Sequence, residues 1–223
     1  MAEVIPLFPL GTVVFPGLML PLNVFEPRYR QLVEDLLELP EDRRTFGVVA
    51  IRSGREVGKD GVSELYDIGC TTLVRRVEQQ DDGRYHLVTT GSRRFRLGQR
   101  DDVSEPYLQA EVEWIDEDPG PGDATALTGR LTATFRSYLE ALGNARGVEI
   151  GIPQLPDDLG VLSYLVAATV VAEVSDKQQL LAATTHTDRV DAEIALLRRE
   201  TALLKRLTAA PAVELRSMPL SPN

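Results

Sequence analysis

Apolar residues follow two different spacings along the chain, and the change between them comes near residue 118. Before it, apolar and polar residues alternate, most clearly in Leu108–Trp114, and this period of two predicts strands with one buried face. Phe46–Ile51 is a compact apolar strand, and Asp82-Gly83 between two alternating segments predicts a hairpin. Residues 1–118 are therefore expected to form a curved antiparallel sheet or pseudo-barrel.

One segment inside this first part breaks the alternation. Glu26–Leu39 carries Pro27 at a first-turn position and apolar residues on one face at helical spacing, so a single helix is expected to pack on the sheet. The strands then give way to Asp116–Asp123, an acidic run rich in Pro and Gly. Such a run indicates a domain boundary, with residues 119–208 forming the second domain.

Beyond that boundary the spacing is helical. An apolar stripe follows Leu127–Leu142, Leu159–Ala172 is apolar nearly all round, and Ser175–Gln178 fits a capping box at a helix start. A long last helix is predicted over Asp188–Leu207. The sequence therefore predicts an α+β fold, in which a pseudo-barrel with one packed helix is followed by a helical bundle and a flexible tail over residues 209–223.

The opening stretch Val4–Phe25 is long and apolar enough to raise the question of a membrane span or an export signal. The prolines at positions 6, 9, 16 and 21 each remove a backbone N–H, at about 3 kcal/mol in a helix interior, so one continuous helix is excluded. No basic residue precedes the run, although a signal peptide would require one. Short strands at Glu3–Leu7 and Gly11–Phe15 fit the prolines better, and no membrane partner is expected.

Overall charge narrows the classes of partner. The chain carries 24 Lys and Arg against 34 Asp and Glu, a net charge of −10, which disfavours nucleic acid and anionic membranes, since both attract basic surfaces. Ion pairs with the many carboxylates explain the basic runs Arg75-Arg76 and Arg93–Arg96, and an RNA-binding sheet is the less favoured interpretation. The single cysteine, Cys70, cannot form an internal disulfide, and the expected location is the cytoplasm.

Catalytic and metal-binding patterns are not evident in the sequence. Gly54–Asp60 resembles a phosphate-binding loop, but it is one residue short, and Asp60 stands where Ser or Thr would bind Mg²⁺. His86 and His186 fall in different predicted regions, with His186 expected to be exposed, whereas metal sites need clustered ligands. Cys70, on an apolar strand, is expected to be a buried structural thiol. We expect no enzyme activity, no metal and no cofactor.

A specific resemblance adds to this picture. Pro6–Leu10 (PLFPL), Val14–Gly17 (VFPG) and Phe25–Tyr29 (FEPRY) closely resemble, in order and spacing, the opening of the amino-terminal, substrate-binding domain of Lon, an ATP-dependent protease. FGVVAI, YDIGCTTLVRRV and GSRRFRL are similar to the family's later strands. The resemblance covers most of the chain, from about Glu3 to Leu207. The sheet half also looks similar to the wider PUA-like group of small barrels.

The resemblance implies a binding function. In the protease this region is followed by an ATPase module and a serine–lysine peptidase, for which 223 residues leave no room. It therefore implies a stand-alone, non-catalytic member that recognises unfolded or misfolded polypeptides, as a substrate adaptor or as a regulator of a protease or chaperone. Phe15, Leu18 and Met19, near the opening turns, are the candidate polypeptide contacts, although apolar residues between strands are more often buried. A small-molecule or RNA-binding PUA-like protein is the alternative.

The last predicted helix leaves the oligomeric state open. It carries a broad apolar face that comprises Leu196, Leu197, Leu203, Leu204 and Leu207. This face would either pack inside the bundle of a single chain or form the seam of a homo-oligomer.

Overall fold

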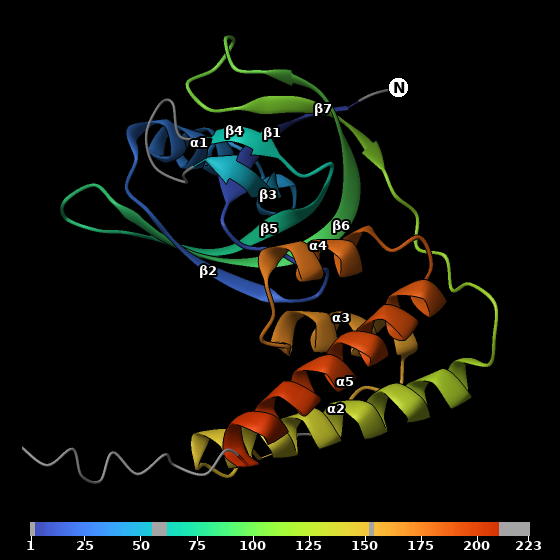
Figure 1. Ribbon diagram of the computed structural model, residues 1–223. Helices are drawn as coiled ribbons and strands as arrows, with labels where there is room; N and C mark the ends of the chain where they lie inside the picture. The colour runs from blue at the N-terminus through green and yellow to red at the C-terminus, as the bar shows by residue number, and fades with distance from the viewer. Residues whose placement is uncertain (1–2, 55–61, 152–153, 210–223) are drawn as a thin grey trace, which may run out of the picture.

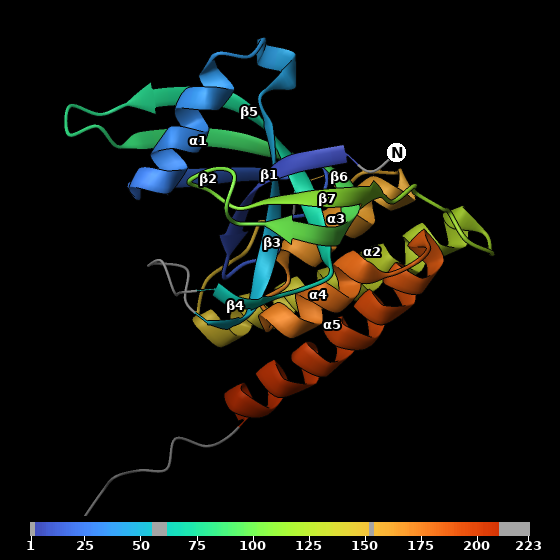
Figure 2. The ribbon, with the colours of Figure 1, turned by 90° about the horizontal axis from the view of Figure 1, so that it is seen from above.

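The computed structural model describes residues 3–54, 62–151 and 154–209. A strand-rich body carries one helix, α1, and four further helices, α2 to α5, gather on one side of it (Figure 1). Seen from above, α1 lies on the side of the strands away from the helical bundle (Figure 2). Strands come first along the chain and helices second, which confirms the predicted α+β order.

The strands form a sheet that closes on itself. Their bounds are β1 Glu3–Leu10, β2 Met19–Val24, β3 Thr45–Gly54, β4 Val62–Leu65, β5 Ile68–Gln79, β6 Tyr85–Asp101 and β7 Gln109–Trp114. Neighbours are hydrogen-bonded in the order β1-β7-β6-β5-β3-β4, and β1 also pairs with β3, which completes a ring. This closing pair is parallel, whereas the other described pairs are antiparallel. The predicted pseudo-barrel is confirmed, with one parallel pairing that the sequence did not indicate.

The loop after β1 differs from the expected strand at Gly11–Phe15. Residues 11–18 are irregular, and strand structure resumes with β2. A turn at Gly17, whose φ of 79° is a left-handed conformation, lies near the end of this loop, before β2. By contrast, the hairpin predicted at Asp82-Gly83 is confirmed: it joins β5 to β6, with Gly83 at φ 78°.

Helix bounds are α1 Pro27–Leu37, α2 Ala124–Arg146, α3 Leu159–Thr169, α4 Val174–Ala182 and α5 His186–Ala209, with a short 3₁₀ turn, η1, at Glu41–Arg43. The capping box expected at Ser175–Gln178 is wrong. Helix α4 begins at Val174 instead, and its N-cap residue Glu173 makes no side-chain cap bond. Gln178 serves another purpose: its Nε2 donates to the carbonyl of Ile68 at 2.8 Å and so ties α4 to β5.

Three buried clusters hold these elements together. One is formed by β1, β3, β4, β6 and β7. A second lies between α1 and the strands, and includes the helix face predicted from its spacing, namely Tyr29, Leu32, Val33 and Leu36. The third fills the bundle and also takes in Val13, Phe15, Ala50 and Ile68 from the strand half. Barrel and bundle therefore share a core.

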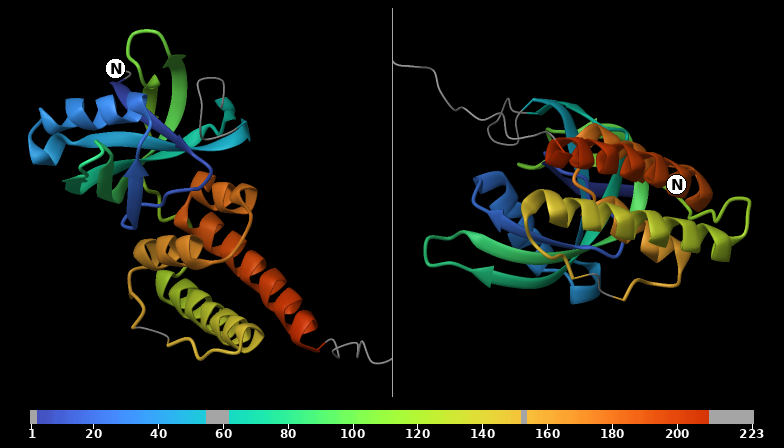
Figure 3. Two further views of the ribbon diagram at one scale, coloured as in Figure 1. Left: turned by 90° about the vertical axis from the view of Figure 1, so that its left-hand side faces the viewer. Right: turned by 60° about the horizontal axis from the view of Figure 1, so that its bottom comes forward.

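Helices α2 and α5 lie side by side and run in the same direction (Figure 3). Their register is marked by an ion pair between Arg130 and Asp191 at 3.5 Å. Leu196 and Leu197 of α5 are buried within the chain, whereas Leu203 is about half exposed. The apolar face of α5 is thus used inside the bundle over this part, and the oligomeric state stays a prediction.

The opening stretch is not a helix: it forms β1, the loop and β2. No helix within residues 3–54, 62–151 and 154–209 combines the length and the apolar content that crossing a bilayer requires.

Candidate functional site

The three residues predicted to contact a polypeptide differ in exposure. Phe15 has 1% of its surface exposed and packs in the shared core, where its ring lies 6.2 Å from that of Tyr164 in α3. Leu18 is half-buried against the same cluster. Met19, the first residue of β2, is 76% exposed. In the folded chain Phe15 is therefore a core residue, and Met19 is the most exposed of the three.

A close crossing of the 11–18 loop and β6 fixes this placement. Gly17 donates its N–H to the carbonyl of Gly91 at 2.9 Å, and Gly91 donates its N–H to the carbonyl of Leu18 at 2.8 Å. A side chain at position 91 does not fit, because an added Cβ would lie 2.1 Å from the carbonyl oxygen of Phe15. Gly91 thus allows backbone to meet backbone, which buries Phe15 and leaves Met19 facing outward.

Strand β2 presents a free edge. It pairs only with β6 among the strands that the structure describes. The bond from Gly91 to Leu18 sets the alternation along β2, so its even-numbered residues bond toward β6 and its odd-numbered residues face away. The outward residues are Met19, Pro21 and Asn23, all exposed. Their carbonyl groups point away from β6, whereas the row of N–H donors is interrupted because Pro21 has none.

A small apolar pocket lies at the far end of β2. It is lined by Phe8, Pro9, Leu10, Leu22, Asn23, Val24, Phe25, Glu26 and Tyr29, and Phe25 is half exposed. The cavity of about 80 Å³ is well below the roughly 300–1,000 Å³ of small-molecule sites. It therefore suits a single side chain better than a cofactor. We call the outward edge of β2 with this pocket the β2 surface.

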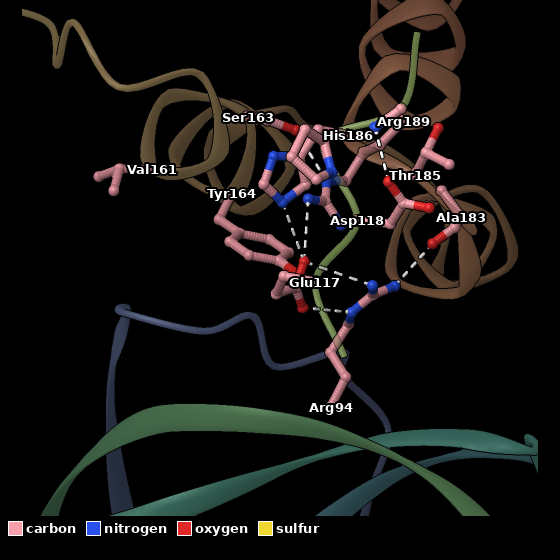
Figure 4. Close-up of polar contacts among 12 residues, drawn as sticks. Arg94, Glu117, Asp118, Val161, Ser163, Tyr164, Ala183, Thr185, His186 and Arg189 are labelled. Carbon is pink, nitrogen blue, oxygen red and sulfur yellow. Dashed lines mark hydrogen bonds and ion pairs between the residues drawn. The ribbon is translucent and has the colours of Figure 1, made fainter. Parts of the chain in front are cut away.

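A polar junction joins barrel and bundle. Arg94 leaves β6 with 1% of its surface exposed, and its guanidinium donates to the carboxylate of Glu117 at 2.8 Å (Figure 4). The same group donates to the carbonyls of Leu181 and Ala183, both at 2.7 Å. One strand side chain thus holds the end of α4, and ion pairing accounts for this member of the basic run.

Glu117, in the connection between β7 and α2, is the centre of the junction. Its carboxylate accepts a hydrogen bond from the Tyr164 hydroxyl at 2.7 Å and lies 3.1 Å from His186 Nε2 (Figure 4). Arg189 Nη2 lies 3.6 Å away. Burial opposes the charge of Glu117, but the hydrogen bonds from Tyr164 and Arg94 and the positive charges of Arg94 and Arg189 outweigh it, so the pKa of Glu117 lies below its ordinary value.

Main-chain contacts extend the junction along the acidic connection. Asp118 and Thr185 form a parallel bridge, and His186 donates its N–H to the carbonyl of Asp118 at 2.8 Å. The Thr187 hydroxyl bonds to two further carbonyls of the connection, at 3.1 and 2.7 Å. The start of α5 is therefore fastened to the run that the sequence indicated as a linker.

A buried polar chain continues from the junction into the bundle. Arg189 Nε donates to the Ser163 hydroxyl at 2.8 Å, and Ser163 donates to Glu193 at 2.9 Å. The guanidinium of Arg189 lies 3.9 Å from the centre of the Tyr164 ring. Burial raises the pKa of Glu193 well above its ordinary value. These groups lie inside the bundle and hold it together, and they are not placed to meet a ligand.

The sequence did not predict the junction or the buried hydrogen bonds that join Arg189, Ser163 and Glu193. Arg189 and Glu193 are four residues apart on a predicted helix, a spacing typical of an exposed ion pair. Both are buried instead. Their position beside the apolar stripe of α5 was the one available signal, because Val190 and Ile194 follow them directly and are buried too.

The remaining sequence candidates do not come together. His86 is exposed in β6, and His186 is half-buried against Glu117, so the expected exposure of His186 is wrong. Cys70 is a buried thiol as predicted, and burial raises its pKa to about 12. Lys59 lies outside the described residues. Within the described ranges, no group of three or more His, Cys, Asp and Glu side chains is arranged to hold a metal ion.

Comparisons with known proteins agree with the resemblance in the opening residues. Residues 4–199 match the family model of the ATP-dependent protease La (LON) substrate-binding domain. Lon protease 2 of Sorangium cellulosum is 32% identical over 209 residues, which cover 92% of this chain and 26% of that protein. The Lon protease of Anaeromyxobacter dehalogenans is 29% identical over 205 residues, or 91% of this chain and 24% of that protein. The chain spans about a quarter of the length of these relatives.

Solved structures share the fold. A Lon N-terminal domain protein from Xanthomonas campestris superposes with a TM-score of 0.63 at 22% identity, covering 86% of this chain and 98% of that one. The N-terminal domain of the Mycobacterium avium complex Lon protease gives 0.63 at 16% identity, covering 88% and 98%. Since the family model extends over nearly all of the described residues and the fold agrees, this chain belongs to the LON substrate-binding domain family.

Proposed function

We propose that this chain binds extended polypeptide segments along the β2 surface. The observation that carries the proposal is the outward edge of β2, where the main-chain groups of Met19, Pro21 and Asn23 have no partner among the described residues. A strand added here gains main-chain hydrogen bonds, which depend little on sequence. The family description, a substrate-binding domain of a protease, supports a polypeptide as the ligand.

The dimensions of the β2 surface indicate the kind of segment it takes. Met19 at one end and Phe25 at the other are six residues apart, about 20 Å along an extended chain. Apolar contacts at both ends favour unfolded chains, because folded proteins bury such side chains. Pro21 removes a donor in the middle of the edge, which weakens pairing and keeps binding reversible. The proposed role is therefore binding alone, as an adaptor or regulator beside a protease or chaperone.

Anisotropy of a labelled, reduced and alkylated test protein measures this binding, with the native form of the same protein as competitor. We expect the unfolded form to bind more tightly. Met19→Asp should weaken binding roughly tenfold. The complex would lose the apolar contact that Met19 gains when a ligand covers it, and it would have to desolvate a carboxylate. Val103→Asp is the matched control, because Val103 is 88% exposed in the connection between β6 and β7 and lies outside the β2 surface.

Two results would contradict the proposal. Equal affinity for folded and unfolded test protein would remove the preference for extended chain. Equal losses in the two variants, both folded by circular dichroism, would place binding elsewhere. Saturable, salt-dependent RNA binding with no polypeptide binding would favour the alternative PUA-like function instead.

A further inference from the structure

The seam between α2 and α5 contains a second pocket, separate from the β2 surface. Thr134 and Ser137 line it from α2, and Arg198, Thr201, Ala202 and Lys205 line it from α5. Its volume is about 250 Å³. The lining contains two cations and three hydroxyl groups, and no carboxylate.

Helix geometry brings the two cations to one place. Arg198 and Lys205 are two turns apart on the same face of α5, about 10 Å along the axis. Thr201 lies between them, and α2 runs alongside in the same direction (Figure 3). Both side chains are long and exposed, so they can converge on a ligand above Thr201.

The acidic residues of α5 nearest to the pocket have other partners. Glu193 is buried and accepts a hydrogen bond from Ser163 at 2.9 Å. Asp191 pairs with Arg130 at 3.5 Å, one step earlier along the same seam. Glu200 pairs with Arg199 at 2.9 Å. In the part of the chain that the structure describes, neither Arg198 nor Lys205 has a carboxylate within ion-pair distance. Uncompensated positive charge is thus concentrated in one pocket of a chain whose net charge is −10.

The hydroxyl groups complete an oxyanion site. Thr134 donates its proton to the carbonyl of Arg130 at 2.8 Å, whereas Ser137 and Thr201 donate to no acceptor among the described residues. A guanidinium fork, an ammonium and two free hydroxyl donors match the oxygens of a phosphate group. The pocket is smaller than a typical small-molecule site of roughly 300–1,000 Å³, which favours a small anion over a nucleotide. We propose that this pocket binds a small phosphate-bearing anion of about the size of pyrophosphate.

Calorimetric titration of the chain with pyrophosphate, and separately with inorganic phosphate, tests the site at constant ionic strength. We expect saturable binding at one site, tighter for pyrophosphate because it reaches both cations. Arg198→Gln and Lys205→Gln should each lower the affinity about tenfold, the loss of one charge-assisted contact. Arg136→Gln is the matched control: it removes the same charge from an exposed position on α2 outside the pocket and should leave affinity unchanged.

The site is refuted if neither anion gives saturable heat at millimolar concentration, or if the control loses as much affinity as the pocket variants. Arg198→Lys serves as a second variant, because it keeps the charge and removes the planar fork. It should bind with intermediate affinity, and affinity equal to that of Arg198→Gln would contradict recognition through charge. Polypeptide binding at the β2 surface is measured separately, so the two proposals fail independently.

Discussion

At the scale of single residues, Arg94 shows how one buried charge holds two layers together. Burying a guanidinium carries a large desolvation cost, which is offset only when its donors find acceptors. Arg94 finds them on both sides of the junction: the carboxylate of Glu117 in the connection, and the carbonyls of Leu181 and Ala183 at the end of α4. This side chain therefore fixes the helical bundle on the barrel.

Removing this side chain should destabilise the fold. Arg94→Met leaves the carbonyls of Leu181 and Ala183 without this donor and removes one of the partners of Glu117, so we expect the free energy of unfolding to fall by about 2–4 kcal/mol. Arg93→Met is the control, because Arg93 is exposed and its partner Asp116 is almost fully exposed, which limits the loss to about 1 kcal/mol or less. Urea denaturation compares the two, and equal losses would show that the junction contributes no more than a surface pair.

At the scale of elements, regular spacing was sufficient to place most helices and strands. Period-two alternation located β7, and helical spacing located α1, α2, α3 and α5 to within a few residues. The failures have local causes. A turn at Gly17 interrupts an apolar run that reads as strand, and Gln178 reaches a strand carbonyl when its spacing indicated a cap. Short apolar runs with Pro and Gly do not by themselves show where extension ends.

The contacts of the junction could not be predicted from the sequence, for a different reason. Arg93, Arg94 and Arg96 are alike in composition, yet only Arg94 is buried. Its carbonyl partners are 87 and 89 residues away along the chain, in the turn that ends α4. No local pattern encodes which of three arginines faces such a distant turn. The placement of Phe15 in the core and Met19 at the surface likewise depends on the crossing with Gly91.

Two glycines test whether that crossing is as tight as the geometry indicates. Gly91→Ala places a Cβ against the carbonyl oxygen of Phe15, so β6 or the loop must move, and we expect a loss of about 1–3 kcal/mol or more in the free energy of unfolding. Gly129→Ala, within α2 where nothing lies within 4 Å, should stabilise the chain by about 0.5–1 kcal/mol. Denaturation midpoints measure both, and a neutral Gly91→Ala would contradict the close approach.

At the scale of the whole molecule, barrel and bundle behave as one unit. They share the cluster that contains Phe15 and Tyr164, and the junction closes around Glu117. The connection between them is bonded to the start of α5 over several residues. We therefore expect a single cooperative unfolding transition that responds to the charge state of the junction.

Acid should weaken this coupling through Glu117. Its pKa in the folded chain lies below its ordinary value of 4.5, so the unfolded chain binds the proton more tightly and acid favours unfolding. The stabilisation is present above about pH 4.5 and is lost as pH falls through the folded-state pKa. Glu117→Gln should be less stable than wild type at pH 7, and the difference should narrow in strong acid.

Urea midpoints across this pH range measure the difference between wild type and Glu117→Gln. Glu113→Gln, at a largely exposed position, is the control and should show no such pH dependence. A gap between wild type and Glu117→Gln that stays constant with pH would show that the carboxylate acts by shape and not by charge.

The acceptors that Arg94 uses on α4 are main-chain oxygens, and this has a consequence for how the region tolerates change. Every amino acid supplies the same carbonyl, so replacing Leu181 or Ala183 leaves the acceptor in place. Adding or deleting one residue between Leu181 and Ala183 would instead shift one oxygen relative to the other, so that Arg94 could no longer reach both. This segment should therefore tolerate many substitutions but no insertion or deletion.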